Sequence, residues 1–414
     1  MKTADEHPRD MEPTILSIAR RKIGGGPQAP FFKTPYLDAA FNGDIFFWDT
    51  CFIAGWAKYY PELPITQALD NFYQVQRSDG HIGRQYAPDG QEVWDSRHPI
   101  SVNPPLLAWA ELELHLHGFD QGRLAKNYAA LCRFHKYLEG MFRNDDGLFH
   151  SDSHGSGMDN LLRSPRGWTP DDKGIPLDAS RCHPQVQSFI NDYLYREDLN
   201  HAVLWNRQGR SVDFSAQMAF DARNLADIAN KLGFLDEEAQ WRREADGINE
   251  AINKHCWNPT TGFYNDLGYG RQIDREHIGM FWTLWSGAAE ESSIVNPLVS
   301  ALEDPSRFGR PFPVPSLSAS DPDYRQWGDY WRGGVWAPTS YMVLRGLAQA
   351  QKMDCATRLS RKMVACVDEV FTNTGTLWEN YAPEFLAYGN PARPDFCGWT
   401  PLIPVSVVKE FLSS

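Results

Sequence analysis

Two stretches in the last quarter of the chain place a carboxylate among aromatic side chains. Glu379 lies in Thr-Leu-Trp-Glu-Asn-Tyr (376–381), and Tyr-Trp-Arg-Gly-Gly-Val-Trp (330–336) precedes it. Aromatic faces stack on sugar rings, while carboxylates, amides and guanidinium groups bind sugar hydroxyls. The combination indicates a carbohydrate site, and acid–base chemistry at such a site requires a second carboxyl group.

The long loop between residues 144 and 168 offers that second group. Asp159 follows Gly-Ser-Gly-Met, and a carboxyl beside small residues can reach into a cavity. The apolar neighbours Met158, Leu161 and Leu162 predict that desolvation raises the pKa of Asp159, so that it is protonated at neutral pH. A protonated carboxyl can donate to a leaving oxygen. The alternative role of Asp159 is an ordinary Asx turn.

Further candidate binding groups lie in the N-terminal quarter. Trp48 could form the floor of a sugar site and Asp49 could bind two sugar hydroxyls, although Asp49 could equally cap the helix that follows. Arg84 and Gln85 supply a guanidinium and an amide in one loop. Asn103 comes directly before two prolines, a position that also suits a helix cap.

Metal and cofactor motifs are not found in the sequence. His150, His154 and the Cys182–His183 pair have a spacing that completes no tetrahedral ligand set. There is no phosphate-binding Gly loop that ends in Lys-Ser/Thr, no dinucleotide fingerprint and no Gly-x-Ser-x-Gly turn. We therefore expect no metal and no cofactor, and the remaining chemistry is that of carboxylates.

Composition points to a small neutral ligand. The chain has 414 residues, with 40 Lys and Arg against 53 Asp and Glu, a formal charge of −13 that argues against nucleic acid or an anionic membrane surface as partner. The seven cysteines form no Cys-x-x-Cys pair, and the N-terminus has no apolar signal region. A cytoplasmic protein with reduced thiols is expected, and the sequence does not indicate its oligomeric state.

Helical periodicity dominates after residue 43, and strand-like runs are short. We expect residues 1–43 to form an irregular N-terminal arm and residues 44–414 to form one mostly helical domain. The predicted helices cover residues 50–60, 101–118, 123–142, 213–232, 236–257, 338–352, 356–371 and 401–412.

A weak internal repeat links these helices. Gly80, Gly147, Gly262 and Gly375 each stand in a polar turn that is followed by apolar or aromatic residues, at intervals of 67, 115 and 113 residues. A period of about sixty residues fits a helical hairpin plus a loop, repeated about six times. The sequence predicts an all-α fold, an (α/α)6 toroid with long loops at one end, and an irregular α-solenoid is the alternative.

Taken in order, the motifs resemble the (α/α)6-barrel inverting glycosidases of glycoside hydrolase families 63 and 37, which include processing α-glucosidases, mannosylglycerate and glucosylglycerate hydrolases, and trehalases. The resemblance spans about residues 44 to 404 and is strongest in the stretches that begin at Tyr330 and Trp378. The matching stretches are 47–49, 80–85, 103–105, 156–160, 330–336, 378–384 and 396–400.

The resemblance implies that Asp159 is the general acid and Glu379 the general base of a catalytic domain. It also implies a sugar pocket lined by Phe47, Trp48, Asp49, Arg84, Gln85, Asn103, Arg332 and Trp336. Some positions depart from the family pattern. His154 and Gly155 stand where an acidic residue often precedes Ser-Gly, Gly83 replaces a common Pro, and Asn103 replaces a common Gln. The Ser-Pro-Arg that often follows Asp-Asn comes three residues late, at 164–166.

The expected activity is that of an inverting, exo-acting α-glycosidase that hydrolyses a glucosidic or mannosidic bond. Inversion requires the two carboxyl groups to lie roughly 6.5–9.5 Å apart, because a water molecule must fit between base and sugar. Arg163 and Arg166 would suit an anionic aglycone such as glycerate, although both could be surface charges. The alternatives are a sugar epimerase on the same toroid, which needs paired histidines, and a carbohydrate-binding protein without activity.

Overall fold

Helices make up most of the computed structural model, which describes residues 10–39, 42–163, 165, 179–187, 209–268 and 270–413. Its inner elements are α2 (Phe47–Ala57), α4 (Leu107–Leu116), α8 (Val212–Leu232), α10 (Trp282–Ser286), α12 (Ala337–Gln349) and the π-helix η5 (Ile403–Leu412). Its outer helices are α1 (Glu12–Arg21), α3 (Ile65–Val75), α5 (Arg123–Phe142), α9 (Leu235–Cys256), α11 (Ser292–Glu303) and α13 (Met353–Thr374).

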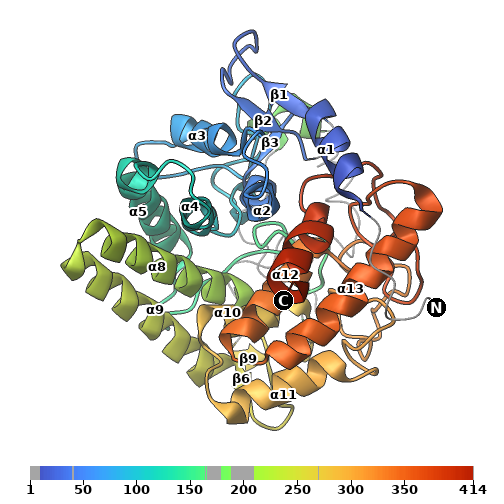
Figure 1. The fold of residues 1–414 in the computed structure, drawn as a ribbon. Helices are drawn as coiled ribbons and strands as arrows, with labels where there is room; N and C mark the ends of the chain where they lie inside the picture. Colours follow the sequence, from blue (N-terminus) through green and yellow to red (C-terminus); the bar gives the residue numbers. More distant parts are fainter. Residues whose placement is uncertain are drawn as a thin grey trace.

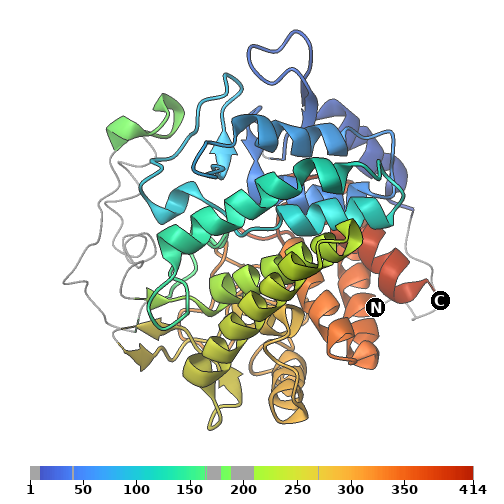
Figure 2. The ribbon, with the colours of Figure 1, turned by 90° about the vertical axis from the view of Figure 1, so that its left-hand side faces the viewer.

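The inner elements form a closed ring. In the described part of the chain, α2 contacts α4, α4 contacts α8, α8 contacts α10, α10 contacts α12, α12 contacts η5, and η5 returns to α2. Figure 1 shows α2, α4, α10 and α12 around the centre, with α3, α5, α9, α11 and α13 outside them. Figure 2 shows from the side that α5, α8 and α9 run side by side. The fold is the (α/α)6 toroid that the sequence predicts.

The short strands join loops and build no layer of their own. They pair as β1 (Ile23–Gly25) with β2 (Pro35–Leu37), β3 (Ile45–Phe46) with β4 (Gln85–Tyr86), β6 (Trp257–Asn258) with β7 (Phe263–Tyr264), and β5 (Gly209–Arg210) with β8 (Leu267–Gly268) and β9 (Arg271–Gln272). Short 3-10 turns cover Pro99–Ser101, Ala179–Arg181, Ile278–Phe281 and Thr400–Leu402. Among the described helices, none is long and apolar enough to cross a membrane.

The glycine turns of the predicted repeat mark the ends of outer helices. Gly80 follows α3, Gly147 follows α5, Gly262 follows α9 and strand β6, and Gly375 directly follows α13. All four have positive φ, between 64° and 99°, a backbone conformation that glycine adopts without a steric penalty. The chain therefore leaves each of these outer helices by the same kind of turn and enters a loop at the same end of the toroid.

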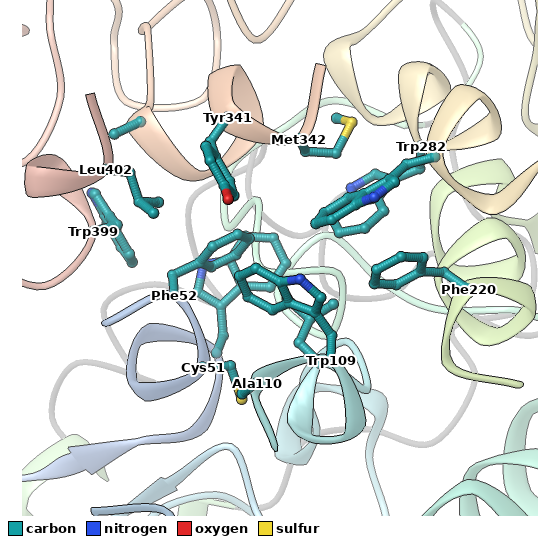
Figure 3. Packing of buried hydrophobic residues seen from close by; sticks show 14 of the residues in the cluster. Cys51, Phe52, Trp109, Ala110, Phe220, Trp282, Tyr341, Met342, Trp399 and Leu402 are labelled. Atoms are coloured by element: carbon teal, nitrogen blue, oxygen red, sulfur yellow. The ribbon is translucent and has the colours of Figure 1, made fainter. Parts of the chain in front are cut away.

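Aromatic side chains fill the axis of the ring (Figure 3). The ring of Trp109 lies 5.7 Å from Phe52 and 5.5 Å from Trp285, and Phe220 lies 4.3 Å from Trp285. Many aromatics that the sequence left open to ligands are therefore core residues. Because the axis is packed, a substrate site can only be built at an end, from the loops.

The N-terminal segment differs from its prediction. We expected an irregular arm, but α1 is regular, and Ile15, Ile18 and Ala19 on one of its faces are buried. The spacing of these residues is that of an amphipathic helix, and tertiary packing stabilises it. The helix α3 was not predicted either, although its apolar residues also recur on one face.

Candidate active site

The candidate site lies where the inner helices begin. The chain that leaves α13 carries Glu379, the chain that leaves α5 carries Asp159, and the chain that leaves α3 carries Arg84. Asp49 lies in the first turn of α2. The repeat of helix, glycine turn and loop thus delivers these groups to one end of the toroid.

Glu379 is a buried carboxyl that is held from several sides. Its backbone N–H donates to the carbonyl of Arg393 (2.9 Å), its carbonyl accepts from the indole of Trp399 (2.9 Å), and its Oε1 accepts from the hydroxyl of Tyr330 (3.1 Å). Burial raises the pKa of Glu379, and Arg393 and the Tyr330 hydroxyl oppose the rise without cancelling it. The group is therefore a stronger base than an ordinary glutamate once it is ionised.

Asp159 lies beside a histidine and an arginine. Its Oδ1 lies 3.1 Å from Nδ1 of His154 and accepts from Arg84 Nη2 at 3.4 Å. Burial acts to raise the pKa of Asp159, but His154 and Arg84 lower it by more, so that it lies below its usual value. The expectation of a raised pKa is wrong, because Met158 and Leu161 are turned into the core and leave the carboxyl among charges.

Asp49 is a third carboxyl at the same place. Burial raises the pKa of Asp49 to about 8, Arg84 opposes the rise, and Glu379 and Asp159 add to it. Asp49 interacts electrostatically with Glu379, Asp159 and Arg84, and Arg84 also donates to Asp159, so these groups lie near one another. At neutral pH the free site can thus offer Asp49 as both donor and acceptor.

Asn160 connects the two principal carboxyls. Its Nδ2 donates to the carbonyl of Asp329 (2.9 Å), and its Oδ1 accepts from the backbone N–H of Trp331 (2.7 Å). Between them, Tyr330 has φ 64° and Asp329 has φ 39°, values that cost a non-glycine residue about 1–2 kcal/mol each. The residue next to Asp159 therefore holds the strained turn whose tyrosine donates to Glu379.

The predicted aromatic residues have different surroundings. Trp48 lies against the Asp159 loop, because a Cβ built on Gly157 in that loop would come within 3.1 Å of the Trp48 ring. Trp336 stacks on Trp331 at 4.1 Å and donates to the carbonyl of Tyr330 (3.2 Å), so it packs against the turn that contains Tyr330. Phe47 packs between Phe72 of α3 and Phe134 of α5, at 5.1 Å from each ring, and contributes to the core.

The predicted polar residues also have different surroundings. Asn103 donates to the carbonyl of His154 (3.5 Å), which places it beside the Asp159 loop. Both ends of the Gln85 amide are used, since Nε2 donates to Asp44 (2.5 Å) and Oε1 accepts from Trp94 (2.8 Å). The guanidinium of Arg332 lies 3.5 Å from a carboxylate oxygen of Asp323 and 3.5 Å from one of Asp329.

Arg163 holds the Asp159 loop and is not available to a ligand. It is 1% exposed, and it donates to both oxygens of Asp213, to Asp266 (3.0 Å) and to the hydroxyl of Ser156 (2.8 Å). The expectation that Arg163 binds an anionic aglycone is therefore wrong, because its charge is already neutralised in the core. Arg166, the other candidate, lies outside the described residues.

Sequence reasoning missed the roles of Tyr330, His154, Asn160 and Arg163 in this arrangement. A tyrosine in an aromatic stretch and a histidine near a carboxylate were visible signals, but most of their partners lie far away in the chain. Within the described ranges, no group of three or more His, Cys, Asp and Glu side chains is arranged to hold a metal ion. Six of the seven cysteines are buried, and Cys132 is partly buried.

Comparisons with known proteins identify the family of the chain. The family model described as the mannosylglycerate hydrolase MGH1-like glycoside hydrolase domain matches residues 45–388. A protein of Borreliella burgdorferi is 24% identical over 78% of this chain, and the probable mannosyl-oligosaccharide glucosidase of Schizosaccharomyces pombe is 24% identical over 83% of it. The chain spans 60% of the first relative and 47% of the second.

Solved structures give the same fold. The GH63 mannosylglycerate hydrolase from Thermus thermophilus, crystallised in complex with glucose, superimposes with a TM-score of 0.70 at 20% identity, and the match covers 95% of this chain and 99% of that one. The family match and the shared toroid lead to one conclusion: the chain belongs to the MGH1-like glycoside hydrolase domains of the family 63/37 group.

Proposed function

We propose that the protein is an inverting, exo-acting glycosidase that hydrolyses an α-glucosidic or α-mannosidic bond of a small glycoside or oligosaccharide. The observation that carries this proposal is the frame that joins its two carboxyls. Asn160, next to Asp159, fixes the turn of Tyr330, and Tyr330 donates to Glu379. A frame of this kind suits two groups that act on opposite faces of one sugar ring.

In the proposed reaction, Asp159 protonates the leaving oxygen while Glu379 removes a proton from a water on the other face of the sugar. The raised pKa of Glu379 supports its role as base, because a base is most effective when its pKa lies near the working pH. The carboxyl groups should lie roughly 6.5–9.5 Å apart when substrate is bound.

The remaining groups are suited to binding the sugar. Asp49 and Arg84 lie near the proposed catalytic pair, and their side chains can bind neighbouring hydroxyls. The Nε1 of Trp48 is buried and has no acceptor among the described residues, and a sugar hydroxyl would supply one. The relative from Thermus thermophilus is named a mannosylglycerate hydrolase, so glycerate conjugates belong among the substrates to be tested.

Time-resolved proton NMR tests the proposal. The protein is mixed with α-glucosides and α-mannosides, including glycerate conjugates and disaccharides, and the anomeric signals of released sugar are followed. We expect the β-anomer first, with turnover reduced by about 10²–10⁴-fold in Asp159→Asn and Glu379→Gln. An α-anomer first would overturn the inverting assignment. A change of sugar identity without release would favour an epimerase, and binding without either would favour a binding protein.

A further inference from the structure

His154 is a buried histidine at the proposed acid that family roles do not explain. It is 3% exposed, and its Nδ1 lies 3.1 Å from Oδ1 of Asp159. Its carbonyl accepts from Arg84 Nη1 (3.1 Å) and from the backbone N–H of Gly157 (2.9 Å). The ring is therefore fixed against Oδ1 of the carboxyl.

A second buried histidine and carboxyl lie next to His154. Nδ1 of His98 lies 3.4 Å from Oδ2 of Asp152, and both side chains are fully buried. Burial raises the pKa of Asp152, and His98 and His154 oppose the rise, so Asp152 interacts with both rings. The charged and titratable groups around His154 are Asp159 and Asp152 from its own loop, Arg84 from the loop after α3, and His98, with Asp95 beyond it, from the loop before α4.

The residue after His154 cannot carry a charged side chain. It is Gly155, whose backbone N–H donates to Oδ1 of Asp152 (2.6 Å). A Cβ at Gly155 would come within 2.7 Å of the carbonyl oxygen of Pro99 and of the hydroxyl of Ser151, so no acidic side chain fits. The ionisable side chains at this turn are instead those of Asp152 and His154.

We infer that His154 and Asp159 hold the catalytic proton jointly, so that His154 is a positioning residue that stores the proton of the acid. In the resting pair the proton lies on Nδ1 of His154. It moves to Oδ1 of Asp159 and from that same Oδ1 to the leaving oxygen, as the glycosidic C–O bond breaks and its electron pair stays on the leaving oxygen. The pair ends as a neutral imidazole and a carboxylate.

The inference rests on the proposed function, and it removes a difficulty in it. A carboxyl whose pKa is lowered is ionised at neutral pH and has no proton of its own to give. A histidine whose Nδ1 lies 3.1 Å from the carboxyl can hold that proton in its place. The neighbouring Trp94 ring, 6.3 Å from that of His154, shields the pair on one side.

One test needs no turnover. In wild-type protein at neutral pH, we expect a low-field proton resonance from the Nδ1–H of His154, assigned by its loss in His154→Asn. It should also disappear in Asp159→Asn. The signal of His135, whose Nδ1 lies 2.8 Å from Asp221 in another buried pair, should remain in both variants. Absence of the His154 signal from folded wild type, or its survival in Asp159→Asn, would overturn the inference whether or not the protein hydrolyses glycosides.

A second test uses the pH dependence of kcat/KM. In His154→Asn the basic limb should move down by about one pH unit, because the carboxyl alone loses its proton sooner than the pair does. Turnover of an alkyl glycoside should fall at least about tenfold more than that of a dinitrophenyl glycoside, which needs no acid. A basic limb that stays in place or moves up would overturn the inference.

His135→Asn is the matched control for loss of a buried histidine–carboxylate pair, and it should leave the limb unchanged even if it lowers stability. His154→Gln is a second variant for the case that His154→Asn misfolds, and thermal unfolding checks that His154→Gln is folded. If wild type releases no sugar from any glycoside, the proposed function fails, and the resonance test still decides whether the pair holds a proton.

Discussion

Glu379 and Asp159 have pKa values displaced in opposite directions, and neighbouring residues decide the direction of each. Glu379 is enclosed by Tyr330 and by the backbone of its own loop, so burial prevails. Asp159 is also enclosed, but His154 and Arg84 touch it, so positive charge prevails. Neither direction can be predicted from adjacent residues alone, since Tyr330 and Arg84 come from other parts of the chain.

Replacing Tyr330 by Phe should shift the acidic limb of the pH profile upward. In the proposed reaction Glu379 acts as the carboxylate, so we expect activity to be lost when the pH falls below its pKa. The Tyr330 hydroxyl stabilises that carboxylate, and its removal raises the pKa further. Hydrogen bonds to charged groups contribute about 1.5–3 kcal/mol, so the limb in kcat/KM should rise by about one pH unit.

Tyr324→Phe is the control for this variant. Tyr324 lies in the same region, but its hydroxyl donates to Glu384 (2.6 Å), which is not a site carboxyl. In Tyr324→Phe, the acidic limb of the pH profile of kcat/KM should coincide with that of wild type. If the acidic limb of Tyr330→Phe also coincides with that of wild type, Tyr330 does not affect the pKa of the proposed base.

At the scale of elements, the loop of the proposed acid, Asp159, and the turn beside the proposed base, Glu379, both depend on the side chain of Asn160. Asn160→Ala should lower kcat/KM about a hundredfold, because displacement of a catalytic group by about 1 Å has an effect of that size. The variant loses both hydrogen bonds to the turn at Tyr330, whose left-handed backbone then relaxes. Steady-state kinetics and the melting temperature should be measured together.

Asn249→Ala separates catalysis from stability. Asn249 in α9 also makes two hydrogen bonds, both with Ser286 at the end of α10, and it lies outside the site. Its loss should lower the melting temperature with little effect on kcat/KM. Equal activity losses in the two variants would mean that Asn160 serves only stability.

The helices were more predictable than the contacts between them. α5 matches its predicted bounds, and α8 and α9 lie within one residue of theirs, because their apolar residues recur at helical spacing between clear ends. The pairing of Asn160 with Asp329 spans 169 residues, and that of Arg163 with Asp266 spans 103. Such pairs leave no local signal, since a loop residue contacts whatever the fold brings to it.

Helix geometry points the side chains of two adjacent candidate residues in different directions. Phe47 and Trp48 are neighbours in the first turn of α2, where successive side chains point in directions about 100° apart. Phe47 therefore packs outward against α3 and α5, while Trp48 lies against the Asp159 loop. The sequence predicts that aromatics gather here, but only the direction of each side chain decides which one reaches a ligand.

At the scale of the whole molecule, the toroid has two different ends. The site lies where the inner helices begin, and a buried ion cluster lies toward the ends of four inner elements. Lys58 at the end of α2 pairs with Glu113 of α4 (2.5 Å) and with Glu410 of η5 (2.8 Å), and Arg345 of α12 pairs with both glutamates. The aromatic core separates the two ends, so the cluster can be changed without touching the site.

Glu113→Gln should destabilise the protein at neutral pH but not at low pH. Burial acts to raise the pKa of Glu113, but Arg345 and Lys58 lower it by more, to about 2. A depressed pKa in the folded state contributes stability above the unfolded value, about 4.3, and this contribution is lost as the pH falls toward 2. The shift corresponds to about 3 kcal/mol of unfolding free energy at pH 7.

Urea unfolding between pH 7 and pH 3 measures this difference. The curves of wild type and Glu113→Gln should lie about 3 kcal/mol apart at pH 7 and approach each other below about pH 4.5. Glu303→Gln, which removes an exposed pair with Arg358, should change stability by less than about 1 kcal/mol at any pH. A gap that does not narrow on acidification would mean that packing, and not the charge of Glu113, joins the four elements at this end.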